Sequence, residues 1–321
     1  MKAIRVQQWG GPEMLRTEEV PDPEVPSGHV LVRLHAAGVN PVETYVRSGT
    51  YAKLPNLPYT PGQDGAGVIE AIGTGVAGLS AGQRVFLSGS LTGTYAEKCL
   101  CSPDQVHLLP ESVTFGEGAA LGVPYATAYR ALVQRGGAKA GDFVLVHGGT
   151  GGVGLAAVQF ARQLGCRVLA TGGTETGRVL LIEQGAEAAF DHHEMGYTEQ
   201  VLAHTDRRGI DLVVEMLANV NLGKDLGMLA KGGRVVVVGS RGAVEINPRD
   251  LMSRDADIRG LVLFNAAPSE LREIYTAIST GLAEGYLKPV VGNRFPLEQA
   301  PSAHEQVLAP GAHGKVILEI N

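Results

Sequence analysis

The feature that most constrains this chain is a glycine-rich turn placed between a buried strand and a helix. The apolar run Phe143–Val146 predicts a strand, and an apolar helical pattern extends from Val153 to Leu164. Between them, Gly149-Thr150-Gly151-Gly152-Val153-Gly154 matches G-x-G-x-x-G. Glycines in this context permit a tight turn and a close approach of the backbone to a pyrophosphate, whose charge the helix N-terminus favours. The segment therefore predicts a dinucleotide-binding unit.

The same pattern occurs a second time without that context. Gly73-Thr74-Gly75-Val76-Ala77-Gly78 follows a β-type run, but turn-like residues come after it, so we expect a hairpin loop. Ser80 lies in a G-x-S-x-G match that would need a strand, a turn and a helix to act as a nucleophile elbow. We expect an ordinary loop serine there.

The predicted secondary-structure pattern changes at about residue 124. Before it, short β-type runs separated by Gly and Pro indicate an antiparallel, barrel-like β domain. After it, about six strands alternate with helices, which predicts a parallel sheet covered on both faces. A length of 321 residues fits two domains. We predict a substrate domain of residues 1–123, completed by the tail 265–321, and a dinucleotide-binding domain of residues 124–264.

Charge and cysteine usage exclude several classes of protein. Lys and Arg total 27 against 33 Asp and Glu, a balance of −6 with no long block of like charge, which argues against a nucleic-acid or membrane-surface binder. Three cysteines cannot form a disulfide framework and suit a reducing compartment. The N-terminus lacks a signal-peptide run, and no window has the length of a membrane span. We expect a cytoplasmic protein.

A short helix is predicted directly after the strand that begins near Val30. Asn40 is placed as an N-cap, Pro41 at the first helical position and Glu43 at the capping-box position. Tyr45 then lies on this helix, and Gly49 ends it.

The end of the second parallel strand informs the choice of dinucleotide. An acid there would bind the ribose 2′-hydroxyl of NAD, but Thr171 is followed by Gly172-Gly173-Thr174, with Glu175 one position later. Small residues followed by Arg178 favour a 2′-phosphate and hence NADP. Arg178 has an equally good interpretation as a solvated helix residue.

Metal binding is not expected. The spacing of Cys99 and Cys101 is too short for the usual zinc pair, and Cys166 stands alone. His192 and His193 are adjacent, so in an extended segment their side chains point to opposite sides. A surface or cofactor-edge role suits His192 better.

Long stretches of the chain resemble the zeta-crystallin branch of the quinone oxidoreductases, in the medium-chain dehydrogenase/reductase superfamily. These stretches are residues 37–51, 58–62, 149–154, 215–222, 238–242 and 245–250. The resemblance runs almost from end to end. It implies an α/β protein with a GroES-like β-rich catalytic domain, a Rossmann doubly wound sheet of strand order 3-2-1-4-5-6, and NADPH in the cleft between the domains.

The resemblance also implies a zinc-independent enzyme. Zinc-dependent relatives carry a Cys after the Gly-Val pair and a Gly-His-Glu near the next strand, whereas this chain has Asn40, Gln63 and Asp64. The four clustered cysteines of a structural-zinc lobe are also missing.

Cofactor contacts carry over where the motifs match. The implied residues are Tyr45 and Thr127 beside the nicotinamide, Thr150, Gly151, Gly152 and Val153 at the pyrophosphate, Gly173 and His192 on the adenosine side, Asn221, Val238, Gly239, Ser240 and Arg241 after later strands, and Leu261, Val262 and Leu263 near the nicotinamide amide. Arg178 has no clear family counterpart and rests on the strand-end argument alone.

Quinone reduction suits a site without a metal or a nucleophile, because the nicotinamide supplies the reducing equivalents. The protein then has to stack the quinone and donate hydrogen bonds to oxygens that gain charge. The candidates are Asn40, Tyr45, Tyr51 and Gln63. Asn40 has an alternative role as an N-cap and Tyr51 as a wall residue. We expect ortho-quinones as substrates, with electron transfer through semiquinones or as hydride left open.

Two other functions remain open. Neighbouring branches of the superfamily reduce activated C=C bonds of enals and enones with NADPH, with a tyrosine or water supplying the proton. The family is also associated with AU-rich RNA binding and a lens crystallin role, against which the negative charge weighs. The family further implies a homodimer or homotetramer, for which the apolar edge strand Arg259–Phe264 is a candidate pairing surface.

Overall fold

The computed structural model describes residues 1–321 and divides into two compact units. The β unit comprises Met1–Val123, Ile278–Glu284 and Lys288–Asn321, and the α/β unit comprises Pro124–Ala277 and Gly285–Leu287. Residues 265–277, which we expected in the first domain, belong to the α/β unit. The reason is that the first turn of helix α9 (Pro268–Glu284) contacts the α/β unit, where Arg130 forms an ion pair of 3.0 Å with Glu270.

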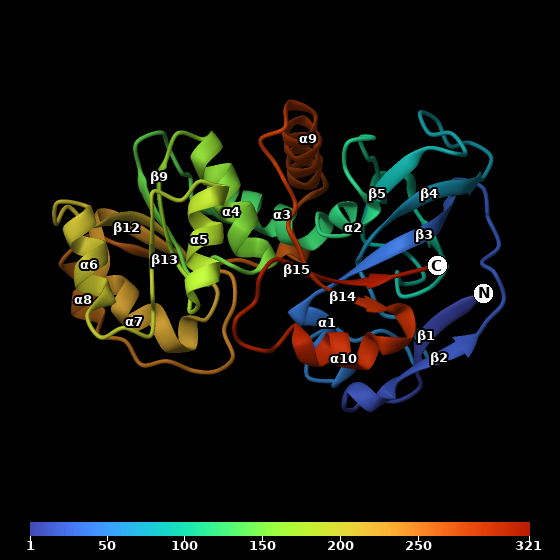
Figure 1. Cartoon of the computed structure of the whole chain (residues 1–321), viewed down its shortest axis with the longest axis horizontal. Helices are drawn as coiled ribbons and strands as arrows, with labels where there is room; N and C mark the ends of the chain where they lie inside the picture. Colours follow the sequence, from blue (N-terminus) through green and yellow to red (C-terminus); the bar gives the residue numbers. More distant parts are fainter. The chain divides into compact units, whose positions relative to one another are not determined.

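The α/β unit is built on a six-stranded parallel sheet with the order β10-β9-β8-β11-β12-β13, which confirms the predicted 3-2-1-4-5-6 arrangement. Helices α4 and α5 pack on one face, and α6, α7 and α8 cover the other (Figure 1). The strands are β8 (Phe143–Val146), β9 (Arg167–Thr171), β10 (Ala188–Phe190), β11 (Ile210–Glu215), β12 (Leu229–Val237) and β13 (Asp257–Gly260). The helices are α4 (Gly152–Gln163), α5 (Glu175–Gln184), α6 (Tyr197–His204), α7 (Ala218–Met228) and α8 (Pro248–Met252).

The last strand of this sheet is shorter than the sequence predicts. An apolar run to Phe264 indicated a longer strand, but β13 ends at Gly260, where its partner β12 also ends at Val237. Leu261 N still donates to Val237 O at 3.0 Å, and a 3-10 turn follows at Leu263–Asn265. An edge strand has one neighbour, so it stops when that neighbour stops.

The β unit contains a seven-stranded sheet of order β14-β15-β3-β4-β5-β7, with β6 paired to β3 (Figure 1). Its pairs are antiparallel except β14 with β15. The strands are β3 (Val30–Val39), β4 (Asp64–Ile72), β5 (Arg84–Ser88), β6 (Lys98–Cys101), β7 (Val106–Leu108), β14 (Val291–Pro296) and β15 (Lys315–Glu319), beside a two-stranded sheet of β1 (Lys2–Val6) and β2 (Leu15–Glu19). Strand β15 pairs with β3, so the C-terminal tail completes the sheet begun by the N-terminal residues.

The second glycine motif lies where expected, in the hairpin loop between β4 and β5. Gly75 and Gly78 have φ values of +86° and +79°, a backbone region that favours glycine, and open space surrounds both. Ser80 is an exposed loop residue. Separately, no helix in the structure combines the length and the apolar character that crossing a membrane requires.

The glycine loop after β8 uses its glycines for different purposes. Gly148 has a φ of +58° and turns the chain out of the strand. A Cβ atom on Gly154 would meet the backbone atoms Gly148 O at 2.5 Å and Gly149 C at 2.6 Å. A Cβ on Gly151 would meet nothing closer than Gly148 O at 3.7 Å. Gly154 therefore permits close packing of the helix against the turn, whereas Gly151 leaves an open backbone.

This difference predicts opposite outcomes for two matched substitutions. Gly154→Ala should destabilise the protein by about 2–3 kcal/mol because its methyl group overlaps fixed backbone, although alanine has the higher helix propensity. Gly151→Ala should change the free energy of unfolding by less than about 1 kcal/mol. Urea denaturation of both variants measures this, and equal stability for the two would contradict the packing role of Gly154.

Candidate functional site

All six parallel strands end at one edge of the sheet, and this edge collects predicted binding residues. Thr150 follows β8, Gly173 follows β9 and His192 follows β10. The other three strands lead to further predicted residues, namely Asn221, Val238, Gly239, Ser240, Arg241, Leu261, Val262 and Leu263. Ligands of open α/β sheets bind outside the carboxyl ends of the strands, so the topology assembles a candidate site from distant segments.

The N-terminus of α4 is open to an anion. Gly151 is its N-cap residue and makes no side-chain cap, so the first amide groups of the helix have no side-chain acceptor. Gly152 and Val153 are half-buried, while Thr150 is 8% exposed. Unpaired amides with the positive end of the helix dipole form a phosphate-type site.

Arg178 is held at the end of β9 and is not a freely solvated helix residue. Its Nη1 donates to Gly172 O at 3.1 Å and to Asp191 Oδ2 at 2.8 Å. Gly173 lies beside His192, whose Cε1 would be 3.2 Å from a Cβ at that glycine. The structure thus brings Arg178, Gly173 and His192 together, and adds Asp191, which the sequence analysis did not consider.

The loops after β11 and β12 are bonded to each other. Ala218 N donates to Gly239 O at 2.9 Å, and a Cβ on Gly239 would meet Met216 O at 2.5 Å. Arg241 N donates to Asn219 Oδ1 at 2.8 Å. Ser240 and Arg241 have exposed side chains at this edge.

Three of the predicted cofactor residues differ in how far their side chains are exposed. Thr127 is buried on helix α3 (Gly122–Tyr129) and does not follow a strand end. Leu263 is buried, whereas Val262 is 44% exposed. A side-chain contact to a ligand is therefore open to Val262 without rearrangement of the core.

In the β unit, a buried ion pair lies beside the predicted N-cap. Lys315 Nζ on β15 donates to Asp64 Oδ2 at 2.8 Å and also to Asn40 Oδ1. Asn40 Nδ2 donates to Asp64 Oδ2 at 2.9 Å, and Asp64 Oδ1 accepts from Val123 N at 2.7 Å. A Cβ on Gly38 would meet Ala119 O at 2.2 Å and Lys315 Cε at 2.8 Å, so only glycine fits between the backbone and the ion pair here.

Asn40 is the N-cap residue of helix α1 (Pro41–Arg47) and forms with Glu43 the capping box that the sequence predicts, while its side-chain amide also donates to Asp64. Glu43 supplies the other half of the capping box: its carboxylate accepts from Asn40 N at 2.9 Å. It also accepts from Gln63 N at 3.0 Å and from Tyr95 Oη at 2.7 Å. Burial raises the pKa of Glu43, and the nearby Lys315 charge opposes this rise.

The remaining candidate substrate residues are all half-buried. Tyr45 lies half-buried on α1, and Tyr51 lies half-buried in the bend that follows. Gln63 is half-buried, with its backbone fixed by Glu43 and by Gly89 N, which donates to Gln63 O at 2.8 Å. The network therefore fixes the backbone at both ends of the segment from Asn40 to Gln63.

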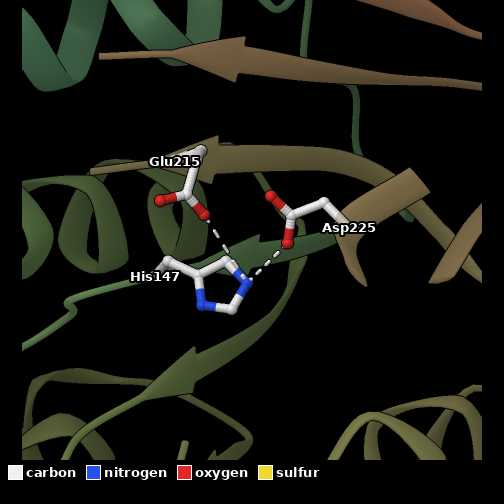
Figure 2. Close-up of side chains that lie close together, drawn as sticks. All are labelled: His147, Glu215 and Asp225. Carbon is white, nitrogen blue, oxygen red and sulfur yellow. Dashed lines mark hydrogen bonds and ion pairs between the residues drawn. The ribbon is translucent and has the colours of Figure 1, made fainter. Parts of the chain in front are cut away.

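A second buried cluster is formed by His147, Glu215 and Asp225 (Figure 2). His147, the residue after β8, places Nε2 at 2.9 Å from Asp225 Oδ1 of α7 and at 3.8 Å from Glu215 Oε2 at the end of β11. All three residues are at most 1% exposed. The 2.9 Å contact is a hydrogen bond, shorter than the edge of about 3.3 Å between two ligands of a tetrahedral metal site. The geometry is that of groups that share protons.

Burial sets the protonation of this cluster. It raises the pKa of Glu215 to about 7, against the charge of His147, which lowers it. Burial also opposes the charge on His147, but the adjacent Asp225 outweighs it and raises the His147 pKa. Because Glu215 titrates above its unfolded value of 4.5, its contribution to stability is lost as the pH rises through about 7.

Neither network follows from a sequence motif. His147 lies two positions before the glycine motif, and Glu215 ends an apolar strand, so charged or titratable residues at strand ends were the available signal. Asp225 and Lys315 lie in helix and strand patterns that give no sign of burial.

Both units match described protein families and solved structures. Residues 152–280 match the model "Zinc-binding dehydrogenase", and residues 26–112 match "Alcohol dehydrogenase GroES-like domain". Quinone oxidoreductase of Homo sapiens is 49% identical over 320 residues, which is 99% of this chain and 97% of the human protein. These matches confirm the predicted fold class.

Two solved structures superpose over 100% of both chains. Escherichia coli quinone oxidoreductase complexed with NADPH gives a TM-score of 0.89 at 27% identity. An NAD-dependent alcohol dehydrogenase gives a TM-score of 0.93 at 30% identity.

The buried ion pair predicts an asymmetric response to substitution. Lys315→Met should cost about 3–5 kcal/mol of stability because it leaves the Asp64 carboxylate buried and unpaired. Adding Asp64→Asn should restore part of that loss by removing the charge. Lys98→Met is the matched control, since Lys98 pairs with Asp22 and Glu70 at the surface, where loss costs about 1 kcal/mol or less. Equal losses for the two lysines in urea denaturation would refute the assignment.

Proposed function

The chain belongs to the quinone oxidoreductase family of the medium-chain dehydrogenase/reductase superfamily, and from that premise we propose that it reduces quinones with NADPH as the electron donor. The observation that carries the proposal is the N-terminus of α4, which begins after Gly151 at the carboxyl edge of the parallel sheet and has no side-chain cap. A pyrophosphate fits this backbone because no side chain occupies it.

The other predicted residues are assigned to the rest of the dinucleotide. In the proposal, the amides of residues 150–153 hold the pyrophosphate, and Arg178 holds the 2′-phosphate with Gly173 and His192 beside the adenosine. Tyr45, Thr127 and residues 261–263 are assigned to the nicotinamide part. Asn221 and residues 238–241 complete the set. NADPH when bound would supply two electrons. With one proton they would convert one quinone to a hydroquinone; passed singly to two quinones they would give two semiquinones, NADP⁺ and a released proton.

The proposed reaction needs no metal ligand at the position of Asn40. Both polar atoms of its side chain are bonded to protein groups, with Lys315 providing the positive charge. We therefore assign Asn40 to positioning α1, which carries Tyr45. Tyr45, Tyr51 and Gln63 remain the proposed donors to the quinone oxygens, where negative charge develops as electrons arrive.

The finer part of the proposal concerns the substrate and the electron count. We propose ortho-quinones as the preferred substrates, with one electron passed to each of two quinones for every NADPH consumed. Reduction of cytochrome c during turnover reports such single-electron products, whereas a strict hydride transfer leaves cytochrome c oxidised.

The test is oxidation of NADPH at 340 nm with EDTA present, using an ortho-quinone and a 2-alkenal in parallel. We expect rapid turnover of the quinone and at least tenfold slower turnover of the alkenal. Preference for the alkenal would move the protein to the reductases of activated double bonds. Binding of NADPH without turnover of either compound would refute an oxidoreductase function for both substrate classes.

The same assay tests Arg178. The wild type should have a higher kcat/KM with NADPH than with NADH. Arg178→Ala should reduce this ratio at least tenfold by raising KM for NADPH alone, because the 2′-phosphate loses a charged hydrogen-bonding partner. Arg162→Ala is the control, because Arg162 lies in the last turn of α4, away from the N-terminus of that helix. An unchanged NADPH/NADH ratio in the Arg178 variant would remove this residue from the site.

We extend the proposal to self-association through the edge strand. Ile258, Val262 and Phe264 are 36%, 44% and 55% exposed along and after β13, whose outer side has no strand partner. Pairing with a second copy would cover this edge. Light scattering should give a dimer or tetramer for the wild type, and Val262→Lys should lower the mass to that of a monomer. A monomeric wild type would exclude the pairing.

A further inference from the structure

The His147–Asp225–Glu215 cluster is bonded to both loops that flank the candidate phosphate site. On one side, His147 Nδ1 lies 3.2 Å from Thr171 Oγ1, and the same hydroxyl accepts from Gly148 N at 3.3 Å. Asp225 raises the pKa of His147, and the protonated ring donates through Nε2 to Asp225 and through Nδ1 to the threonine hydroxyl. This chain of bonds connects α7 with the first residue of the glycine loop.

On the other side, Glu215 holds the loop after β11. Its Oε1 accepts from Leu217 N and from Asn221 Nδ2, the latter at 3.2 Å. Its backbone carbonyl accepts from Val238 N at 2.8 Å and from Gly239 N at 3.2 Å. Three residues assigned to the cofactor, Asn221, Val238 and Gly239, are thus fixed by Glu215, which is itself buried.

Two oxygens of the cluster lack a hydrogen-bond donor. Glu215 Oε2 and Asp225 Oδ2 are buried without a partner. A proton on Glu215 supplies a donor inside the cluster, whereas a charged Glu215 leaves two carboxylates together in a region without water contact.

We propose that this cluster is a positioning unit for the dinucleotide: it fixes the glycine loop relative to the loop after β11, and it does so best when Glu215 is protonated. The assignment to NADPH rests on the proposed function, but the effect on the two loops does not. The residues act through the backbone they hold, since none of the three is exposed to a ligand.

Among the groups around the cluster, Asp225 opposes the charge on Glu215, whereas the charge of His147 stabilises it. Tyr197 of α6 packs its ring edge-on to His147 at 6.4 Å, Lys224 of α7 lies 5.7 Å from that tyrosine ring, and His192 follows β10. Asp225 raises the pKa of His147 and Lys224 lowers it, while Tyr197 and His192 are the other titratable groups within electrostatic reach of the cluster. Loss of the Glu215 proton adds a negative charge near a site that binds phosphate, and so weakens anion binding.

The first experiment measures amide hydrogen exchange without any ligand. Asp225→Asn should speed exchange about tenfold in peptides covering residues 147–152 and 216–222, while a peptide covering α5 stays unchanged. Glu183→Gln, an exposed carboxylate on α5, is the control and should alter neither loop. Unchanged protection of either loop in the Asp225 variant would overturn the positioning role.

The second experiment measures the Kd for NADPH from pH 6 to pH 8.5 by fluorescence, for the wild type, Glu215→Gln and Glu183→Gln. The cofactor phosphate titrates in the same range, so the ratio of wild-type to Glu215→Gln Kd is the informative quantity. This ratio should rise at least threefold across the range, because glutamine keeps the donor and cannot ionise. A constant ratio would overturn the proton dependence.

The two proposals fail in different ways. If the wild type does not bind NADPH at any pH, the proposed function is wrong, and hydrogen exchange still decides the positioning role. If NADPH binds and the Glu215→Gln profile follows the wild type, only the inference about the cluster fails. Steady-state assays add a further check: KM for NADPH should rise in Asp225→Asn, with kcat at saturating NADPH unchanged.

Discussion

The contact between Gly154 and the turn that begins at Gly148 is the constraint on which the α/β unit depends. Their backbones approach so closely that a single methyl group would overlap carbonyl atoms. This approach brings the N-terminus of α4 against the end of β8, where no side chain caps the first amides of the helix. A parallel sheet can offer a phosphate site at this edge only when the turn is this tight.

Buried charge is used in the same way in both units. Lys315 and Asp64 connect the C-terminal strand β15 to β4, and Asn40 joins them to the start of α1. His147, Asp225 and Glu215 connect three elements of the α/β unit. Such groups contribute little net stability, because desolvation offsets their attraction. Their effect is to select one arrangement of the loops, since any other leaves a charge unpaired.

These arrangements fit the chemistry expected of a nicotinamide-dependent reductase. The cofactor supplies the electrons, so the protein has to hold two rings at a fixed separation and stabilise oxygens that gain charge. Rigid loops serve that purpose better than reactive side chains. Asn40 illustrates the point, because its amide is bonded to Lys315 and Asp64, and its contribution is to place α1 and Tyr45.

The alternation of strands and helices, the two-unit organisation and the glycine loop followed from the sequence, because periodicity and glycine spacing are local signals. The order of the strands was implied by the family resemblance. The sequence also distinguished the motif at Gly149 from its copy at Gly73 by the flanking helix. Tertiary structure alone decided that β13 ends at Gly260, that Arg178 is bound to Asp191, and that two polar networks are buried. Residues such as His147 and Asp225 are 78 positions apart, and only the folded sheet brings them together. Burial and pairing between distant segments leave no periodic trace in the chain.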